Sequence, residues 1–242
     1  MKIEFPLDVM INLHTQYYFT NNAERQKEIN ECLLKNINNR YIGAIYIYVA
    51  TLDDHDLFLK TELYNSLSYY KKSKICVIFN YHKEYKYQYD RNKMTYFDFL
   101  QTASNCTSNE FVNVLANSDI YFDETIAYVS KMKPKECYAI TRHEVLEDGK
   151  AEIVLGKDSQ DVWIVRGKAT IDDLEQTKFP LGVAGCDNRI AYILHNSGYN
   201  VKNPATKIKC YHLHKSKFRD YRNEDGTLKE LIPPPYHFLE PY

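Results

Sequence analysis

The sequence predicts an α/β fold in which helices cover both faces of a mainly parallel central sheet. From the first strand to residue 123, runs of β-branched and aromatic residues alternate with runs of helical periodicity. The run Phe111–Asp123 ends in polar and acidic residues, and strands of such sheets end this way at the rim where ligands bind. No internal repeat or linker interrupts the 242 residues, so we expect a single domain spanning residues 1–242.

Composition excludes several classes of protein. A net charge of -1 gives no general electrostatic case for binding nucleic acid. The six cysteines form no CxxC pair, which argues against a zinc ribbon or a disulfide scaffold and predicts reduced thiols in the cytoplasm. No apolar run reaches the ~18 residues of a membrane helix, and acidic residues interrupt the apolar start, so neither a transmembrane segment nor a signal peptide is expected.

The first half alternates regularly. Val9–Tyr18 has the pattern of a strand, and Asn21-Asn22 can cap a helix that runs to about Asn36. Ile42–Ala50 predicts a central strand, acidic residues 53–56 a loop, and Leu57–Tyr70 a helix. A strand is expected at Lys74–Tyr81 and a helix at Met94–Ala103. Between them, the basic, tyrosine-rich segment His82–Lys93 is expected to be either a mobile loop over the sheet or a segment that becomes ordered when a ligand binds.

After Asp123 the order of elements changes. We expect a short helix at Glu124–Lys131, a turn at Glu147–Lys150 and a helix at Asn188–Ser197. The expected strands are Cys137–Val145, Ser159–Arg166, Tyr199–Val201 and Ile208–His214. The tail at Tyr221–Tyr242 should be extended and have no core of its own.

Phosphate-binding glycine motifs are absent. The turn after the first strand reads HTQYYFTNN, without the GxGxxG of a Rossmann dehydrogenase, and the chain has no GxxxxGK[ST] loop. A phosphate ligand would therefore have to be held through a metal ion.

Three polar clusters lie at strand or helix ends. Asp119, within Asn117-Ser118-Asp119, offers a carboxylate to a hard divalent cation, although Asn117 and Asp119 can equally form a plain turn. His212 and His214 alternate on a strand and so share a face, although two satisfied surface histidines would give the same pattern. Asp187 begins a helix, where it can serve as the N-cap.

The order of these motifs resembles glycosyltransferases of the GT-A fold. It is most similar to a viral and bacterial group that includes the N-terminal domain of the large chlorovirus glycosyltransferase. The similar stretches are ANSDIYFDETI (116–126), AITRHE (139–144), SQDVWIVRG (159–167), LGVAGCDNRIAYILHNSGYNVKNP (181–204) and IKCYHLHKS (208–216).

The resemblance implies a metal site and a catalytic base. Asp119 stands at the second acid of the family's DxD motif and His212, or His214, at its C-terminal metal histidine, so Mn²⁺ or Mg²⁺ is the implied cofactor. Asn117 replaces the first acid, which weakens the case for tight metal binding. Asp187 matches the base of inverting members. Asp161 is the second candidate for acceptor contact, with a structural salt bridge as its alternative.

The resemblance also implies a nucleotide pocket in residues 1–123 and an acceptor half in residues 124–220. The residues that it places near the base, ribose or diphosphate are Gln16, Tyr17, Arg25, Asn80, Thr95, Asp98, Asn117, Ser118 and Asp119. From its place in a first helical turn alone, Arg25 is expected to be exposed and solvated. Asp123 is expected to brace its loop, and Trp163 to pack in the core.

The implied activity is metal-dependent transfer of a sugar from a UDP-sugar donor to a hydroxyl of a glycan or glycoprotein acceptor. A sugar nucleotidyltransferase is one alternative, although HTQYYFTNN lacks the glycine- and lysine-rich loop of those enzymes. A nucleotide- or glycan-binding module without catalysis is another, and the Asn117 departure supports it.

Overall fold

Seven strands form one large sheet in the computed structural model, which describes residues 9–79, 93–105, 108, 110–156, 159–214, 227–228 and 231–242. The strands are β1 (Met10–Gln16), β2 (Ile42–Val49), β3 (Ile75–Phe79), β4 (Phe111–Ala116), β6 (Glu136–Ile140), β9 (Val162–Arg166) and β10 (Asn200–Lys202). Their order is β10-β6-β9-β4-β1-β2-β3. Neighbours are parallel except β9, which runs antiparallel to β4 and β6. The predicted mainly parallel sheet is confirmed.

A second sheet has four short strands in the order β5-β11-β7-β8. They are β5 (Ile120–Phe122), β7 (His143–Val145), β8 (Ala151–Ile153) and β11 (Cys210–His212). Strand β11 is antiparallel to β5 and parallel to β7. The prediction of one strand over Cys137–Val145 is wrong, because the chain leaves the large sheet after Ile140 and joins the small sheet at His143.

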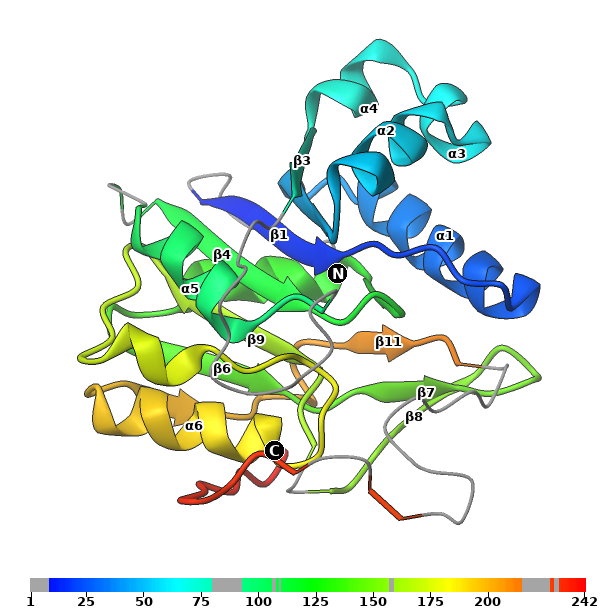
Figure 1. The fold of residues 1–242 in the computed structure, drawn as a ribbon. Helices are drawn as coiled ribbons and strands as arrows, with labels where there is room; N and C mark the ends of the chain where they lie inside the picture. Colours follow the sequence, from blue (N-terminus) through cyan, green and yellow to red (C-terminus); the bar gives the residue numbers. More distant parts are fainter. Residues whose placement is uncertain are drawn as a thin grey trace.

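Helices cover both faces of the large sheet (Figure 1). They are α1 (Ala23–Asn38), α2 (Leu52–Lys60), α3 (Glu62–Asn65), α4 (Tyr69–Ser73), α5 (Tyr96–Ser104) and α6 (Cys186–Asn196), with the 3₁₀ helices η1 (Glu124–Lys131) and η2 (Leu174–Thr177). Apolar residues of α1, α2 and η1 pack on one face, and those of α5 and α6 on the other. No described helix is long and apolar enough to cross a bilayer.

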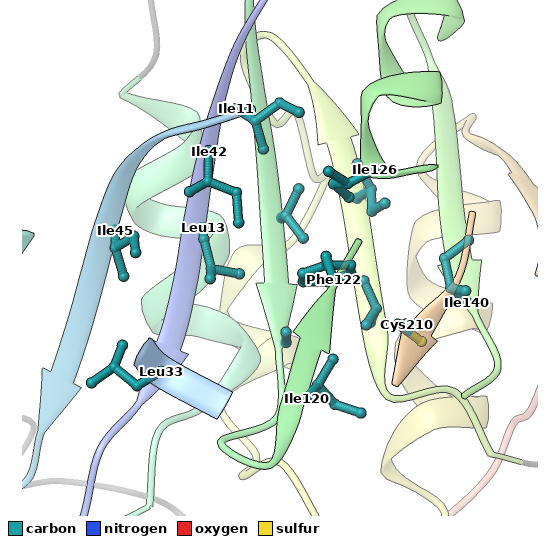
Figure 2. Close-up of a cluster of buried hydrophobic side chains, with 14 of the residues drawn as sticks. Ile11, Leu13, Leu33, Ile42, Ile45, Ile120, Phe122, Ile126, Ile140 and Cys210 are labelled. Atoms are coloured by element: carbon teal, nitrogen blue, oxygen red, sulfur yellow. The ribbon is translucent and has the colours of Figure 1, made fainter. Parts of the chain in front are cut away.

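Helix α1 forms as its sequence predicts. The Asn22 side chain accepts a hydrogen bond from the Arg25 backbone N–H at 3.0 Å and so caps the helix. Ile29, Leu33 and Ile37 recur at helical spacing and are buried. Figure 2 shows Leu33 on the same side of the sheet as Leu13 and Ile42.

The region after β2 differs from the prediction. Residues 53–56 are helical in α2 instead of forming a loop, and the expected helix at Leu57–Tyr70 is divided among α2, α3 and α4. Thr51 and Asp54 form a capping box, which starts the helix early, and the acidic first turn suits the positive end of the helix dipole.

The end of the chain packs against α6. Ile232 and Leu239 are buried in the same apolar cluster as α6, and the His237 backbone N–H donates to the Asn188 carbonyl at 3.0 Å. Figure 1 shows the C-terminus beside this helix. The tail is extended as predicted, yet its described part contributes to the main core.

The strand order reverses between β1 and β4. Chain segments lead from β1 outward to β2 and β3, and then back to β4 on the other side of β1. In open α/β sheets the carboxyl ends of two such strands diverge and leave a crevice, which is the usual position of a ligand. Asp119 comes three residues after β4, at this position.

Candidate active site

One carboxylate and two imidazoles meet beyond the end of β4. The candidate ligand atoms of Asp119, His212 and His214 all lie within 4.8 Å of one another. His212 Nε2 is 3.0 Å from Asp119 Oδ2, and His214 Nδ1 is 3.6 Å from the same oxygen. Pairing of β5 with β11 produces this meeting, because it places His212 opposite Ile120. We refer to these three residues as the rim triad.

Glu144 orients one histidine of the rim triad. Parallel pairing of β7 with β11 places Glu144 beside His212, and Glu144 Oε2 lies 2.7 Å from His212 Nδ1. Burial alone would lower the pKa of His212, but its hydrogen bonds with Asp119 and Glu144 raise that pKa to about 10. A carboxylate on the second ring nitrogen is the usual support of a metal-binding histidine.

Arg25 faces the rim triad from α1. Its guanidinium donates from Nη2 to Asp119 Oδ2 at 2.7 Å and from Nη1 to His214 Nδ1 at 3.0 Å. The expectation of an exposed, solvated Arg25 is wrong, since the residue is only 8% exposed. Burial would raise the pKa of Asp119, but the neighbouring His212 and His214 imidazoles and the charge of Arg25 hold it well below the ordinary value.

A chain of ion pairs continues from the rim triad to Asp161. Arg142 donates to Glu144 Oε1 at 2.6 Å and to Asp161 Oδ2 at 3.0 Å. Asp161 Oδ1 accepts from the Asn117 side-chain amide, also at 3.0 Å. Asp161 thus forms a structural salt bridge, which was the alternative to its expected role in acceptor contact. The side chain of Asn117 is held by Asp161.

Asp187 lies in the first turn of α6, near Asp161. The N-cap of α6 is Gly185, which has no side chain to cap the helix, so Asp187 is not the N-cap. Its Oδ1 accepts a hydrogen bond from the Tyr96 hydroxyl at 2.9 Å. Burial, and then the negative charge of Asp161, raise the pKa of Asp187 to about 7. A carboxylate with this pKa can take up and release a proton near neutral pH.

The candidates from the end of β1 have different environments. Gln16 and Ser118 line a small pocket against α1, and Gln16 Oε1 accepts from the Met94 N–H at 3.1 Å. Tyr17 also borders this pocket, but the residue is 2% exposed, its ring packs against Phe58, and its hydroxyl donates to Asn30 at 2.8 Å. Its face is therefore covered by the core and is not presented to a nucleobase.

Other candidates have local structural roles. Thr95 and Asp98 form the capping box of α5, and both are buried. Asp123 caps η1 and accepts from the Tyr211 hydroxyl at 2.7 Å, so it braces its loop as expected. Trp163 is buried in the core as expected. Asn80 and most of the segment at His82–Lys93 lie outside the described residues.

Three residues of the site were not singled out from the sequence. Arg142 and Glu144 are two apart in AITRHE, and alternation on an extended segment could have suggested a shared face. Tyr96 carried no such signal, because its contact with Asp187 joins residues 91 positions apart.

No protein-family model and no curated protein matches the sequence. A solved structure with some similarity is 4-diphosphocytidyl-2C-methyl-D-erythritol synthase from Anaerococcus prevotii. It aligns with a TM-score of 0.46 and 10% identity, over 90% of this chain and 95% of that chain. A similarity with a TM-score below 0.5 does not indicate the function of this protein, which is therefore inferred from the site.

Proposed function

We propose that the protein is a metal-dependent glycosyltransferase of the GT-A type, which transfers a sugar from a nucleotide-diphosphate donor such as a UDP-sugar to a glycan hydroxyl. The observation that carries this proposal is the rim triad of Asp119, His212 and His214 at the switch point between β1 and β4. A chain of hydrogen bonds links it to Asp161, whose charge acts on Asp187.

The residues of the rim triad fit a divalent cation. One carboxylate and two imidazoles from adjoining segments converge, and Glu144 supports His212 from behind. Imidazole and carboxylate donors together suit Mn²⁺ better than Mg²⁺, which prefers oxygen ligands alone. When bound, the cation would offset the negative charge that develops on a departing diphosphate.

The donor would lie in the crevice beside the rim triad. Near the ends of β1 and β4, Gln16 and Ser118 line the small pocket against α1. The side chain of Asn117 is turned to Asp161, so Asp119 is the carboxylate of the Asn-Ser-Asp motif that remains for the diphosphate-bound metal. The departure from the DxD pattern thus removes one acidic contact and leaves the other in place.

Asp187 would activate the acceptor. It would take the proton from the acceptor hydroxyl while the hydroxyl oxygen attacks the anomeric carbon and the bond to the diphosphate breaks. The Tyr96 hydroxyl would hold the carboxylate in position. Such base catalysis is typically worth ~10²–10⁴ in rate.

A panel of nucleotide sugars tests the proposal. Slow hydrolysis of one donor, dependent on Mn²⁺ and lost on chelation, is the expected result. Asp187→Asn should abolish hydrolysis while leaving affinity for the free nucleotide nearly unchanged, since Asp187 faces the acceptor. Absence of metal-dependent turnover on every donor would contradict the proposal.

A second assay, supplied with nucleoside triphosphates and sugar phosphates, distinguishes the nucleotidyltransferase. That enzyme would release pyrophosphate from a nucleoside triphosphate and a sugar phosphate, whereas a glycosyltransferase releases a nucleoside diphosphate. Pyrophosphate release by the wild-type protein would replace our proposal with that alternative.

A further inference from the structure

We propose that Arg25 is an internal counter-cation of the rim triad, which a divalent metal must displace before it can bind. The inference rests on the proposed function for the identity of the metal site and adds a control on its occupancy. It follows from the position of one buried guanidinium on two of the three ligand atoms.

The guanidinium engages the same lone pairs that a metal would need. Arginine has donors only, so its 3.0 Å contact makes His214 Nδ1 an acceptor, which is the form of imidazole that binds metals. Asp119 Oδ2 receives the second nitrogen at 2.7 Å. A divalent cation between these atoms would lie against a buried positive charge, and like charges repel strongly where water is excluded.

A second partner is ready for the displaced side chain. Glu28 lies one turn further along α1 and is buried, and its Oε2 is already 3.1 Å from Arg25 Nη1. The Tyr18 hydroxyl accepts from Arg25 Nε at 3.1 Å. Because Asn22 caps the helix at the Arg25 backbone N–H, the backbone is fixed there and the movement would be confined to the side chain.

The consequence is a site that holds metal weakly while Arg25 is in place. Removing the positive charge should therefore tighten metal binding, although removal of a residue next to a ligand set normally weakens it. The direction of the change in metal affinity therefore distinguishes a displaced Arg25 from an Arg25 that only supports the ligands.

The experiment measures Mn²⁺ affinity without nucleotide, by calorimetry or by the electron spin resonance of free Mn²⁺. Arg25→Met and Arg25→Gln should each bind Mn²⁺ at least tenfold more tightly than the wild type. Lys35→Met is the matched control, because it removes one positive charge from the exposed side of the same helix, and it should change affinity less than twofold. Equal or weaker binding by both Arg25 variants would overturn the inference.

Stability provides a second readout. Loss of Arg25 leaves a buried carboxylate without this partner, so both variants should melt lower than the wild type, and Mn²⁺ should raise their Tm more than that of the wild type. The double variant Arg25→Gln/Asp119→Asn should lose the gain in affinity, and its retention would overturn the assignment to this site.

The outcomes also separate this inference from the proposed function. Tighter metal binding by the Arg25 variants, with no turnover of any nucleotide sugar, would support the displacement and refute the glycosyltransferase. Metal-dependent turnover by the wild type, with a metal affinity that is the same in the Arg25 variants, would support the glycosyltransferase and refute the displacement of Arg25.

Discussion

At the scale of single residues, burial shifts the protonation of two side chains in ways that matter for different properties. Asp187 is pushed toward the protonated form, and its pKa of about 7 bears on the proposed base catalysis. His14 is pushed toward the neutral form, and its pKa of about 4 bears on stability. Each gives a pH dependence of known sign.

Donor turnover should follow the ionisation of Asp187. A base acts when deprotonated, so kcat/KM should rise with pH through about 7 and then level off. Asp161→Asn removes a negative charge that raises this pKa, and should shift the inflection to lower pH. A pH–rate profile measures both, and an inflection that persists in Asp187→Asn would show that another group acts as the base.

The free energy of unfolding should fall in acid through His14. Its Nδ1 lies 3.0 Å from the Tyr48 hydroxyl and its Nε2 3.3 Å from Asn113 Oδ1, in the core beside α5. The unfolded chain takes up a proton near pH 6.5 and the folded protein only near pH 4, so stability is lost as pH falls through this interval. Over the whole interval, the titration of His14 should lower the free energy of unfolding by about 3 kcal/mol.

Urea denaturation at several pH values checks this prediction. His14→Gln replaces the imidazole with an amide, which can donate and accept hydrogen bonds but cannot titrate. The stability of this variant should therefore decline less between pH 6.5 and 4 than that of the wild type. Parallel declines of the two proteins would show that His14 does not contribute.

Some residues of the site could be predicted from sequence and others could not. Asp119, His212 and His214 were singled out because carboxylates and imidazoles at strand ends suggest metal chemistry. Arg25 was expected to be solvated, because its position in a first helical turn says nothing of Asp119, 94 residues further along the chain. Burial of a charge by a distant partner leaves no local pattern.

At the scale of elements, the start of α6 positions Asp187 and depends on a glycine. Gly185 has a φ of 81°, in the left-handed region, and precedes the helix as its N-cap. A Cβ built at this residue would lie 2.7 Å from the Tyr236 hydroxyl and 2.8 Å from the Ile232 carbonyl oxygen. The C-terminal tail therefore packs directly onto the turn that presents Asp187.

Gly185→Ala should destabilise the protein by more than 2 kcal/mol, roughly the upper range for a strained, crowded glycine position. Gly198→Ala is the matched control, because its φ is 80° but nothing lies within 4 Å of its Cβ, so only about 1 kcal/mol of backbone strain applies. Chemical denaturation compares the two, and equal losses would show that tail packing does not contribute at Gly185.

Elements with strong periodicity were predicted well. Helix α1 and strands β1 and β2 fall within two residues of expectation, because each has both an apolar pattern and a boundary signal. Residues 53–56 were assigned to a loop from their charge alone, although Thr51 and Asp54 carry a capping signal. The strand expected at Cys137–Val145 divides because its two parts pair with different sheets, which only tertiary structure decides.

At the scale of the whole molecule, the two sheets meet at the proposed active site. β4 leads into β5 through Asp119, and β6 leads into β7 through Arg142. These two crossings from the large sheet to the small one each carry a residue of the ion-pair chain. The alternation of elements predicted the large sheet, but short strands such as β5 and β11 give no separable signal, so the sequence alone could not reveal the small sheet.

The most direct test of the central claim is calorimetric titration of UDP with and without Mn²⁺, in the wild type and in Asp119→Asn. We predict that Mn²⁺ tightens UDP binding to the wild type by at least tenfold, because Asp119, His212 and His214 would hold the cation against the diphosphate. In Asp119→Asn the Mn²⁺ effect should disappear while weak binding remains. UDP binding that is absent, or that is indifferent to both Mn²⁺ and Asp119, would contradict this account of the site.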